Sequence, residues 1–204
     1  MIETSDGEFA AAVVVNAAGA WVDEIARAAG VSPIGISPRR RTAITIDAPA
    51  GMELTTLPLT VGMAEDFYFK PDAGRLMVSP ADETPMPPCD VQPDELDIAI
   101  AAARFEEVSA LEVRQIRSKW AGLRSFAPDR APVIGFDVRA SGFFWLAGQG
   151  GYGIQTAPAA GRLTAGLIRN GDVPEDLLEA GLVLSDVAPS RLRAASTSES
   201  VALS

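Results

Sequence analysis

Histidine is absent from the 204-residue sequence, and cysteine occurs once. Without an imidazole, the chain cannot supply the base of a Ser-His-Asp triad or the histidine ligands of the common zinc sites. The single cysteine, Cys89, cannot form an internal disulfide or a metal cluster, and its proline-rich surroundings indicate an ordinary loop thiol. We therefore expect no metal site and no catalytic side chain of these classes.

Basic residues and long apolar runs are also scarce. Lys and Arg number 17 against 27 for Asp and Glu, so the net charge is −10, which disfavours nucleic acids and anionic membranes as partners. No segment approaches the roughly 18 continuous apolar residues of a membrane-spanning helix. The first eight residues are acidic and lack the pattern of a secretory signal. Together with the single cysteine, these features predict a reducing, cytoplasmic setting.

The first forty residues have the pattern of a strand, a turn and a helix. The apolar run from Ala11 to Val15 is typical of a strand buried on both faces of a parallel sheet. Small residues follow from Asn16 to Ala20, where a backbone must pass close to another group. The helical spacing from Trp21 to Ala29 then predicts a helix that ends before Gly30.

The segment from Pro38 to about Arg124 has the pattern of an antiparallel sheet with one helix. Short alternating runs occupy residues 42–46, 67–70, 75–79 and 112–120. The sequence Pro-Asp-Ala-Gly at 71–74 predicts a hairpin turn, because proline presets φ and glycine accepts a positive φ. A helix is expected over 93–111, with an apolar face made of Leu96, Ile100, Ala103, Val108 and Leu111.

The parallel-sheet pattern returns after residue 130. Strands are expected at 132–136 and 143–147, and a helix from about Thr156 to Arg169, with Pro158 at an early helical position. The sequence therefore predicts an α+β (mixed α/β) chain. Its parts are a partial Rossmann-like domain made of residues 1–36 and 126–175, an antiparallel-sheet domain at 37–125, and a poorly ordered tail at 176–204.

Four glycines lie between the last predicted strand and helix, at positions 148, 150, 151 and 153. Glycines remove Cβ atoms where the main chain approaches a flat or phosphorylated ligand, and the following helix N-terminus favours negative charge. A glycine-rich tight turn without a ligand is the alternative. The spacing also differs from the dinucleotide motif GxGxxG, so the glycines alone do not indicate a nucleotide.

Three ordered segments give the sequence a recognisable family pattern. These are Trp-Ala-Gly-Leu-Arg at 120–124, Asp-Arg-Ala-Pro-Val-Ile-Gly at 129–135, and the run from Phe143 to Pro158 that contains the four glycines. They resemble the C-terminal half of the FAD-dependent D-amino-acid oxidase and dehydrogenase family, to which glycine and sarcosine oxidases are related. The segments 67–74 and 90–93 are most similar to the D-arginine dehydrogenases.

The resemblance covers roughly residues 13–176 and has one major gap. The family's N-terminal glycine-rich turn, which holds the ADP half of FAD, has no counterpart in this sequence. The segment that lies against the flavin ring has none either. We therefore expect the chain to be a C-terminal piece of a longer flavoenzyme, with residues 1–36 and 126–175 in the FAD-binding domain and 37–125 in the substrate domain.

The resemblance also implies which residues bind the substrate. Arg124 corresponds to the clamp of the substrate α-carboxylate, and Tyr68 to a tyrosine whose hydroxyl adds a hydrogen bond to that carboxylate. Arg41 corresponds to a second carboxylate or pocket arginine, and Gly151 to the residue whose carbonyl meets the substrate amine. The alternatives are a surface role for Arg124, a packing role for Tyr68, and a solvated charge cluster at residues 39–41.

Flavin contacts are implied at the two turns that follow the parallel strands. The resemblance assigns them to Ala17, Ala18, Gly19, Trp21, Gly148, Gly150, Gly151, Tyr152, Gly153, Ile154 and Gln155. The dipole of the helix after the second turn would stabilise negative charge on the reduced flavin.

The implied function is FAD-dependent oxidation of D-amino acids to imino acids and 2-oxo acids, by hydride transfer to flavin N5. Basic substrates such as D-arginine are favoured, which would place the protein in amino-acid catabolism. Two alternatives stay open. The chain is an inactive fragment that needs an N-terminal half from another chain, or it is similar to glycine and sarcosine oxidases.

Overall fold

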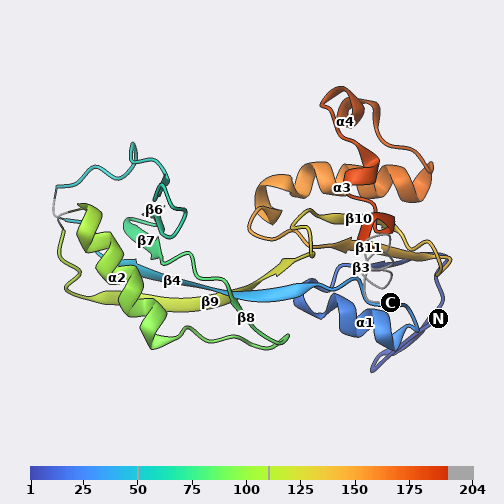
Figure 1. Cartoon of the computed structure of the whole chain (residues 1–204), viewed down its shortest axis with the longest axis horizontal. Helices are drawn as coiled ribbons and strands as arrows, with labels where there is room; N and C mark the ends of the chain where they lie inside the picture. Colours follow the sequence, from blue (N-terminus) through green and yellow to red (C-terminus); the bar gives the residue numbers. More distant parts are fainter. Residues whose placement is uncertain (50, 110, 193–204) are drawn as a thin grey trace, which may run out of the picture. The chain divides into compact units, whose positions relative to one another are not determined.

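The computed structural model describes residues 1–49, 51–109 and 111–192. The chain divides into two compact units (Figure 1). Unit 1 consists of Met1–Ser37 and the chain from Ser125 onward, and unit 2 is Pro38–Arg124. Both units contain helices and sheets, so the prediction of a mixed α/β chain is confirmed.

Unit 1 is built on a three-stranded sheet in the order β10 (Val133–Phe136), β11 (Phe143–Ala147), β3 (Val14–Asn16). Strands β10 and β11 are antiparallel, whereas β11 and β3 are parallel, with Trp145 opposite Asn16. The strand predicted at 11–15 begins at Val14, and the Val15 side chain is 41% exposed. The expectation that this strand is buried on both faces is wrong, because β3 lies at the edge of the sheet.

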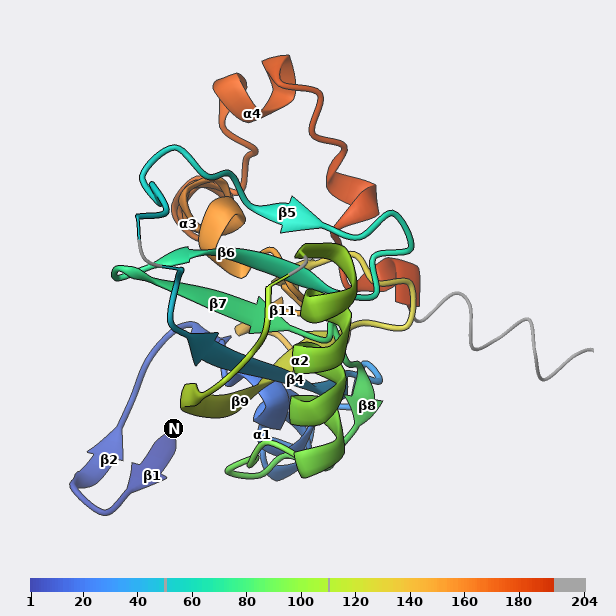
Figure 2. The same ribbon diagram turned by 90° about the vertical axis from the view of Figure 1, so that its left-hand side faces the viewer.

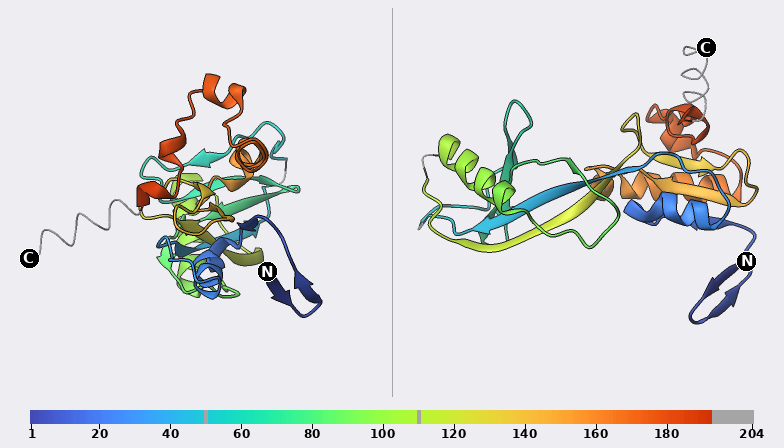
Figure 3. Two further views of the ribbon diagram at one scale, coloured as in Figure 1. Left: turned by 90° about the vertical axis from the view of Figure 1, so that its right-hand side faces the viewer. Right: turned by 60° about the horizontal axis from the view of Figure 1, so that its bottom comes forward.

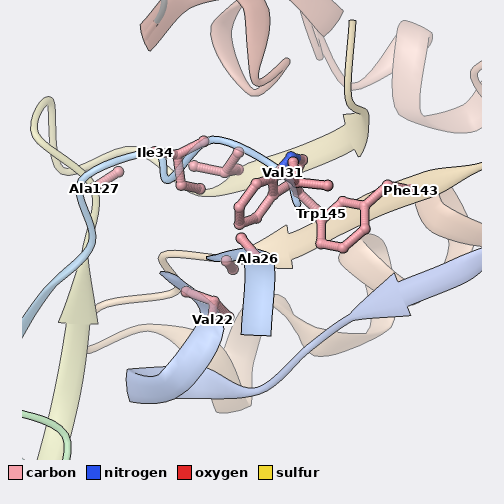
Figure 4. Packing of buried hydrophobic residues seen from close by; sticks show 9 residues of the cluster. Val22, Ala26, Val31, Ile34, Ala127, Phe143 and Trp145 are labelled. Atoms are coloured by element: carbon pink, nitrogen blue, oxygen red, sulfur yellow. The ribbon is translucent and has the colours of Figure 1, made fainter. Parts of the chain in front are cut away.

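Helices cover both faces of this sheet. On one face lie the 3-10 turn η1 (Gly19–Trp21) and helix α1 (Val22–Ala28), and on the other lies α3 (Gly153–Arg169). Successive residues of β11 alternate between the two faces, as a strand requires. Trp145 packs with Val22 and Ala26 on the α1 side (Figure 4), whereas Phe144 packs with Leu163 on the α3 side.

The remaining elements of unit 1 are short. Strands β1 (Ile2–Thr4) and β2 (Gly7–Phe9) form an exposed hairpin apart from the three-stranded sheet (Figure 3). Helix α4 (Glu175–Glu179) and the 3-10 turn η2 (Leu184–Asp186) follow α3. Three side chains of this region, Leu177, Leu182 and Val187, pack against the α3 cluster. Residues 176–192 thus differ from the expected poorly ordered tail, and 193–204 lie outside the described residues.

Unit 2 is an antiparallel sheet with one helix packed across it (Figure 2). The strand order is β5-β6-β7-β4-β8, and β9 also pairs with β4. The strands are β4 (Ser37–Ile46), β5 (Thr60–Val61), β6 (Tyr68–Asp72), β7 (Arg75–Ser79), β8 (Thr84–Pro85) and β9 (Ile116–Phe126). Helix α2 (Glu95–Ser109) forms the core of the unit with apolar residues of β4 and β7.

Several details of unit 2 differ from the sequence prediction. The strand expected at 112–120 is β9 at Ile116–Phe126, and the strand expected at 42–46 begins earlier, at Ser37. The β6–β7 hairpin exists, but Pro71 lies within β6, and the turn is made by Ala73 and Gly74 with φ of 48° and 78°. Helix α2 buries Ile98, Ala101 and Phe105, whereas Leu96 and Val108 of the predicted face are 67% and 56% exposed.

Candidate functional site

The parallel strands β3 and β11 create a switch point in unit 1. Both strands end at the same edge of the sheet, because they are parallel neighbours. The chain then passes from β3 into α1 on one face and from β11 into α3 on the other. Open α/β sheets bind ligands at such a point, outside the carboxyl ends of the strands. All residues predicted to contact the flavin belong to these two connections or to the first turn of the helix that follows.

The first connection, from Asn16 to Trp21, is fixed by a buried asparagine. The Asn16 amide donates from Nδ2 to the Val22 carbonyl at 2.8 Å, and its Oδ1 accepts from the Ala18 N–H at 3.4 Å. Gly19 has φ of +57°, and no other heavy atom lies within 4 Å of where its Cβ would be. Trp21 is 42% exposed. This connection therefore offers an open backbone position beside an exposed indole.

The second connection contains glycines that the backbone path requires. Gly148 and Gly150 have φ of +71° and +54°, and the Gly150 N–H donates to the Ser125 carbonyl at 2.9 Å. A Cβ on Gly150 would lie 2.7 Å from the Phe126 ring. Gly151 lies in the same connection and is exposed.

Helix α3 begins at Gly153, three residues earlier than the sequence predicted. Its first turn is uncapped by any side chain and contains no acidic residue, so the N–H groups of Gly153, Ile154 and Gln155 point out of the helix end. Tyr152 and Ile154 are 63% and 96% exposed. Because the helix starts early, Pro158 lies within its interior rather than near its start.

The two connections suit a planar, negatively charged group such as FAD. Uncapped N–H groups at the start of α3 favour negative charge. The backbone at Gly19 has no side chain to block an approaching ring, and Trp21, Tyr152 and Ile154 offer exposed apolar surface. The assignment of these residues to the cofactor stays a prediction.

In unit 2, the three side chains predicted to bind the substrate lie together. Arg124 at the end of β9 donates from Nη2 to the Tyr68 hydroxyl on β6 at 3.3 Å. The Arg41 guanidinium on β4 lies 5.9 Å from the centroid of the Tyr68 ring. The fold thus gathers an aromatic hydroxyl and two guanidinium groups from three separate strands.

These side chains lie on the sheet face opposite α2. Phe69, the neighbour of Tyr68, points the other way and meets the α2 residue Phe105 edge-on at 5.3 Å. Side chains alternate along a strand, so Tyr68 faces away from the helix. The register places Ser79 of β7 directly opposite Tyr68. The α2 side of the sheet is therefore apolar core, and the other side carries the polar groups.

Arg41 is held by two residues that the sequence analysis missed. Its Nε donates to the Asp82 carbonyl at 2.8 Å, and its Nη2 donates to the Glu83 carboxylate at 3.2 Å. The Arg41 side chain is only 11% exposed. Because 41 and 42 residues separate the partners, no local pattern could have indicated these contacts.

The neighbouring arginine, Arg40, faces the helix instead. It pairs with Asp97 of α2 at 2.7 Å and lies 3.6 Å from the Asp82 carboxylate. Burial, with a contribution from the Asp82 charge, raises the pKa of Asp97. The Asp82 carboxylate also accepts a hydrogen bond from the Thr42 N–H at 2.6 Å. Asp82 therefore contacts three successive residues of β4, Arg40, Arg41 and Thr42. Arg40 and Arg41 are therefore paired and largely buried, unlike a solvated charge cluster.

A further cavity of about 540 Å³ in unit 2 lies away from these residues. It is lined by apolar residues such as Ile46 and Phe105 and by the ion-paired Asp47 and Arg117. Within residues 1–49, 51–109 and 111–192, no group of three or more His, Cys, Asp or Glu is arranged to hold a metal. No helix in the same ranges is long and apolar enough to cross a membrane.

The chain is similar in sequence to proteins that are known or named as FAD-dependent oxidoreductases and to an amino-acid oxidase. The chain is 30% identical over 176 residues to bovine (Bos taurus) FAD-dependent oxidoreductase domain-containing protein 1, covering 78% of this chain and 36% of that protein. It is 27% identical to glycine oxidase from Geobacillus kaustophilus, covering 87% of this chain and 46% of the oxidase. The chain thus spans less than half the length of these relatives.

A solved structure shares the fold over nearly the whole chain. L-proline dehydrogenase from P. horikoshii superposes with a TM-score of 0.81 at 26% identity, over 95% of this chain and 50% of that one. These relatives do not single out the D-arginine dehydrogenases that the sequence motifs favoured. Residues 2–167 match the family model described as "FAD dependent oxidoreductase" (DAO). The chain therefore belongs to the DAO family of FAD-dependent oxidoreductases.

Proposed function

We propose that this chain forms the amino-acid site and part of the flavin site of an enzyme that oxidises α-amino acids. The observation that carries the proposal is the Arg124–Tyr68 pair, with Arg41 beside the same ring. A guanidinium next to a phenol hydroxyl is well suited to a carboxylate, because it offers a planar fork of N–H donors and one O–H donor.

The residues of the chain would bind and orient rather than react. Arg124 and Tyr68 hold the α-carboxylate, and the Gly151 carbonyl accepts a hydrogen bond from the substrate amine. The residues assigned above to the cofactor, in the two connections of unit 1 and the first turn of α3, hold FAD, which supplies the hydride acceptor when bound. The first turn of α3 stabilises negative charge placed against it.

The overall change removes two electrons and two protons from the amino acid and gives an imino acid. Water then converts the imino acid to a 2-oxo acid and ammonia. No side chain needs to form a covalent bond in this sequence, which fits a chain without histidine and with one cysteine. Positioning and electrostatics are the contributions of the protein.

D-amino acids are the proposed substrates, with basic ones favoured by the sequence motifs. Glycine and its N-methyl derivative are the second candidate, because a similar protein is a glycine oxidase. We also propose a cytoplasmic location, which is compatible with the unpaired Cys89.

A substrate screen of the flavin-loaded protein, together with any further part of the flavoprotein that it needs (the complete flavoprotein), tests the proposal. D-amino acids of each charge class, glycine, N-methylglycine and L-proline would be compared by kcat/KM. Turnover of any of these classes supports amino-acid oxidation and ranks the candidates. A purified, flavin-loaded protein that oxidises none of them would contradict the proposal, and a protein that retains no flavin would support the alternative of an inactive chain.

A further inference from the structure

The C-terminal segment of unit 1, residues 182–192, lies along strand β10. The Ile134 N–H on β10 donates to the Val187 carbonyl at 2.8 Å. Further along the segment, the Leu192 side chain packs against the core cluster that contains Trp145. Strand β10 is the edge of the three-stranded sheet, so the segment contacts an edge that is not paired with another strand of that sheet. Residues 182–192 are therefore an integral part of the folded unit.

Arg191 joins this segment to the loop between β9 and β10, residues 127–132. Its Nε and Nη2 donate to the two carboxylate oxygens of Asp129 at 2.6 and 3.0 Å, and Nη2 also donates to the Ala131 carbonyl at 2.9 Å. Its Nη1 donates to the Ala188 carbonyl at 3.0 Å. The Arg191 side chain is only 15% exposed. Every nitrogen of the guanidinium thus has an acceptor, and the planar fork fixes the loop to the C-terminal segment.

The β9–β10 loop in turn contacts the connection between β11 and α3. A Cβ on Gly148 would lie 3.4 Å from the Ala131 carbonyl oxygen and 3.5 Å from the Ala127 Cβ, so the Gly148 backbone lies directly against the loop. The carbonyl oxygen next to Gly148 is the same one that accepts a hydrogen bond from Arg191. A single carbonyl group therefore lies between the C-terminal arginine and the connection.

The position of this connection depends on its buried part. Gly148 is buried, whereas Gly151 and Tyr152 are exposed. A glycine-rich segment restrains its own backbone weakly, so its path is determined by the groups that it packs against. A small displacement of the loop next to Gly148 would therefore move the exposed residues as well. In a binding site, a shift of about 1 Å is enough to lower the strength of the contacts.

We propose that Arg191 is a positioning residue for the flavin. By holding the Ala131 carbonyl against Gly148, it sets the path of residues 148–152 and thereby the affinity for FAD. This inference rests on the proposed function, in which these residues contact FAD. Arg191 acts through the loop and touches neither the flavin nor the substrate. The C-terminal segment thus contributes to cofactor retention, although it lies outside the residues 126–175 that the sequence assigned to the FAD-binding domain.

The affinity of the complete flavoprotein for FAD tests this role. The apoprotein would be titrated with FAD while the change in flavin fluorescence is recorded, and urea unfolding of each apoprotein would be measured alongside. Arg191→Gln should weaken FAD binding about tenfold or more, because the charged fork and its contact with Ala131 are lost. Arg191→Lys keeps the charge but not the fork, so it should weaken binding less, about threefold, and it serves if Arg191→Gln does not fold.

Two control variants separate positioning from a general loss of stability. Arg162→Gln removes another arginine–aspartate pair of unit 1, formed with Asp176 at 2.7 Å, which joins α3 to α4. Leu177→Ala removes a side chain that packs against the α3 cluster and should lower the free energy of unfolding. Both variants should keep the Kd for FAD within about twofold of the wild-type value, because the β9–β10 loop keeps its contacts.

A third variant, Gly151→Val, distinguishes failure of this inference from failure of the proposed flavin site. It places a branched side chain where the flavin is proposed to approach, so it should weaken FAD binding. Weaker binding in Gly151→Val, with an unchanged Kd in folded Arg191 variants, overturns the positioning role and leaves the flavin site intact. An unchanged Kd in all of these variants overturns both. Equal weakening in Arg191→Gln and Leu177→Ala would follow from stability alone and also overturns the positioning role.

Discussion

Arg124 donates a hydrogen bond from Nη2 to the hydroxyl of Tyr68 at 3.3 Å, although 56 residues separate the two in sequence. The contact joins the end of β9 to the start of β6 and leaves both groups on the sheet face opposite α2. In the proposed carboxylate site this contact would reduce the cost of binding, because neither side chain must be ordered when a substrate arrives.

Replacing Arg124 with lysine tests this site. In the complete flavoprotein, Arg124→Lys should reduce kcat/KM by about a hundredfold or more, because a point charge replaces a two-donor fork. Tyr68→Phe should cost less, about tenfold, since one neutral hydrogen bond is lost. Steady-state kinetics on the preferred substrate measure both effects, and a near-normal kcat/KM for Arg124→Lys would show that Arg124 is not the clamp.

The strand that carries Tyr68 could be predicted, because Tyr68 alternates with the apolar Phe67 and Phe69. The strand that carries Arg124 was predicted only in part: β9 extends to Phe126, beyond the run expected at 112–120, and its exposed and buried residues do not alternate. The contacts of Asp82 and Glu83 carry no such signal, because ion pairs between distant segments depend on the tertiary fold alone. The sequence therefore singled out three side chains that the fold brings together, Arg41, Tyr68 and Arg124, but not the residues that hold Arg41.

Helix α2 shows a second limit of what the sequence alone could predict. Both the predicted face, with Leu96 and Ile100, and the buried face, with Ile98 and Phe105, have helical spacing of apolar residues. Alanines occupy many of the remaining positions, so hydrophobicity alone does not choose between the faces. The choice is made by packing, because Phe105 fits against Phe69 of the sheet.

The connection between β11 and α3, which contains Gly150, gives a prediction about stability. Gly150→Ala should destabilise the chain by about 1–3 kcal/mol, because φ of +54° is unfavourable for alanine and the new Cβ would meet the Phe126 ring. Gly161→Ala in the middle of α3 should instead stabilise by about 0.5–1 kcal/mol, since nothing lies near its Cβ. Urea unfolding measures both changes, and equal effects of the two substitutions would contradict this account of the loop.

Exposed apolar groups in unit 1 predict self-association of the 204-residue chain. Val15 at the sheet edge, Trp21 and Ile25 are 41–45% exposed, and Ile154 is 96% exposed. Apolar surface of this kind promotes association. Sedimentation velocity should detect oligomers that diminish in Ile154→Gln, with Arg114→Gln as a surface control. A wild-type chain that stays monomeric at high concentration and holds stoichiometric FAD would refute the prediction.

The Asp129–Arg191 ion pair predicts a loss of stability in acid. Arg191 donates to both carboxylate oxygens, at 2.6 and 3.0 Å, and these bonds lower the pKa of Asp129 in the folded chain. A lowered folded pKa means that the stabilisation is present above the unfolded pKa and is lost as the pH falls below about 4.

This direction of the pH dependence can be checked with the free energies of unfolding of the wild type and Asp129→Asn, measured from pH 6 to about pH 2. The wild type should be the more stable at pH 6, and the difference should shrink as the pH falls. A difference that is constant across the range would show that the ion pair contributes no pH dependence.

Anaerobic reduction of the flavin tests the proposal that this chain supplies the substrate site of an FAD-dependent amino-acid oxidoreductase. The complete flavoprotein would be mixed with candidate amino acids while the flavin band at about 450 nm is recorded. We expect the band to bleach with an amino acid in the wild type and to bleach far more slowly in Arg124→Lys. Retention of the full yellow band with every amino acid tested, or equal bleaching in both proteins, would contradict it.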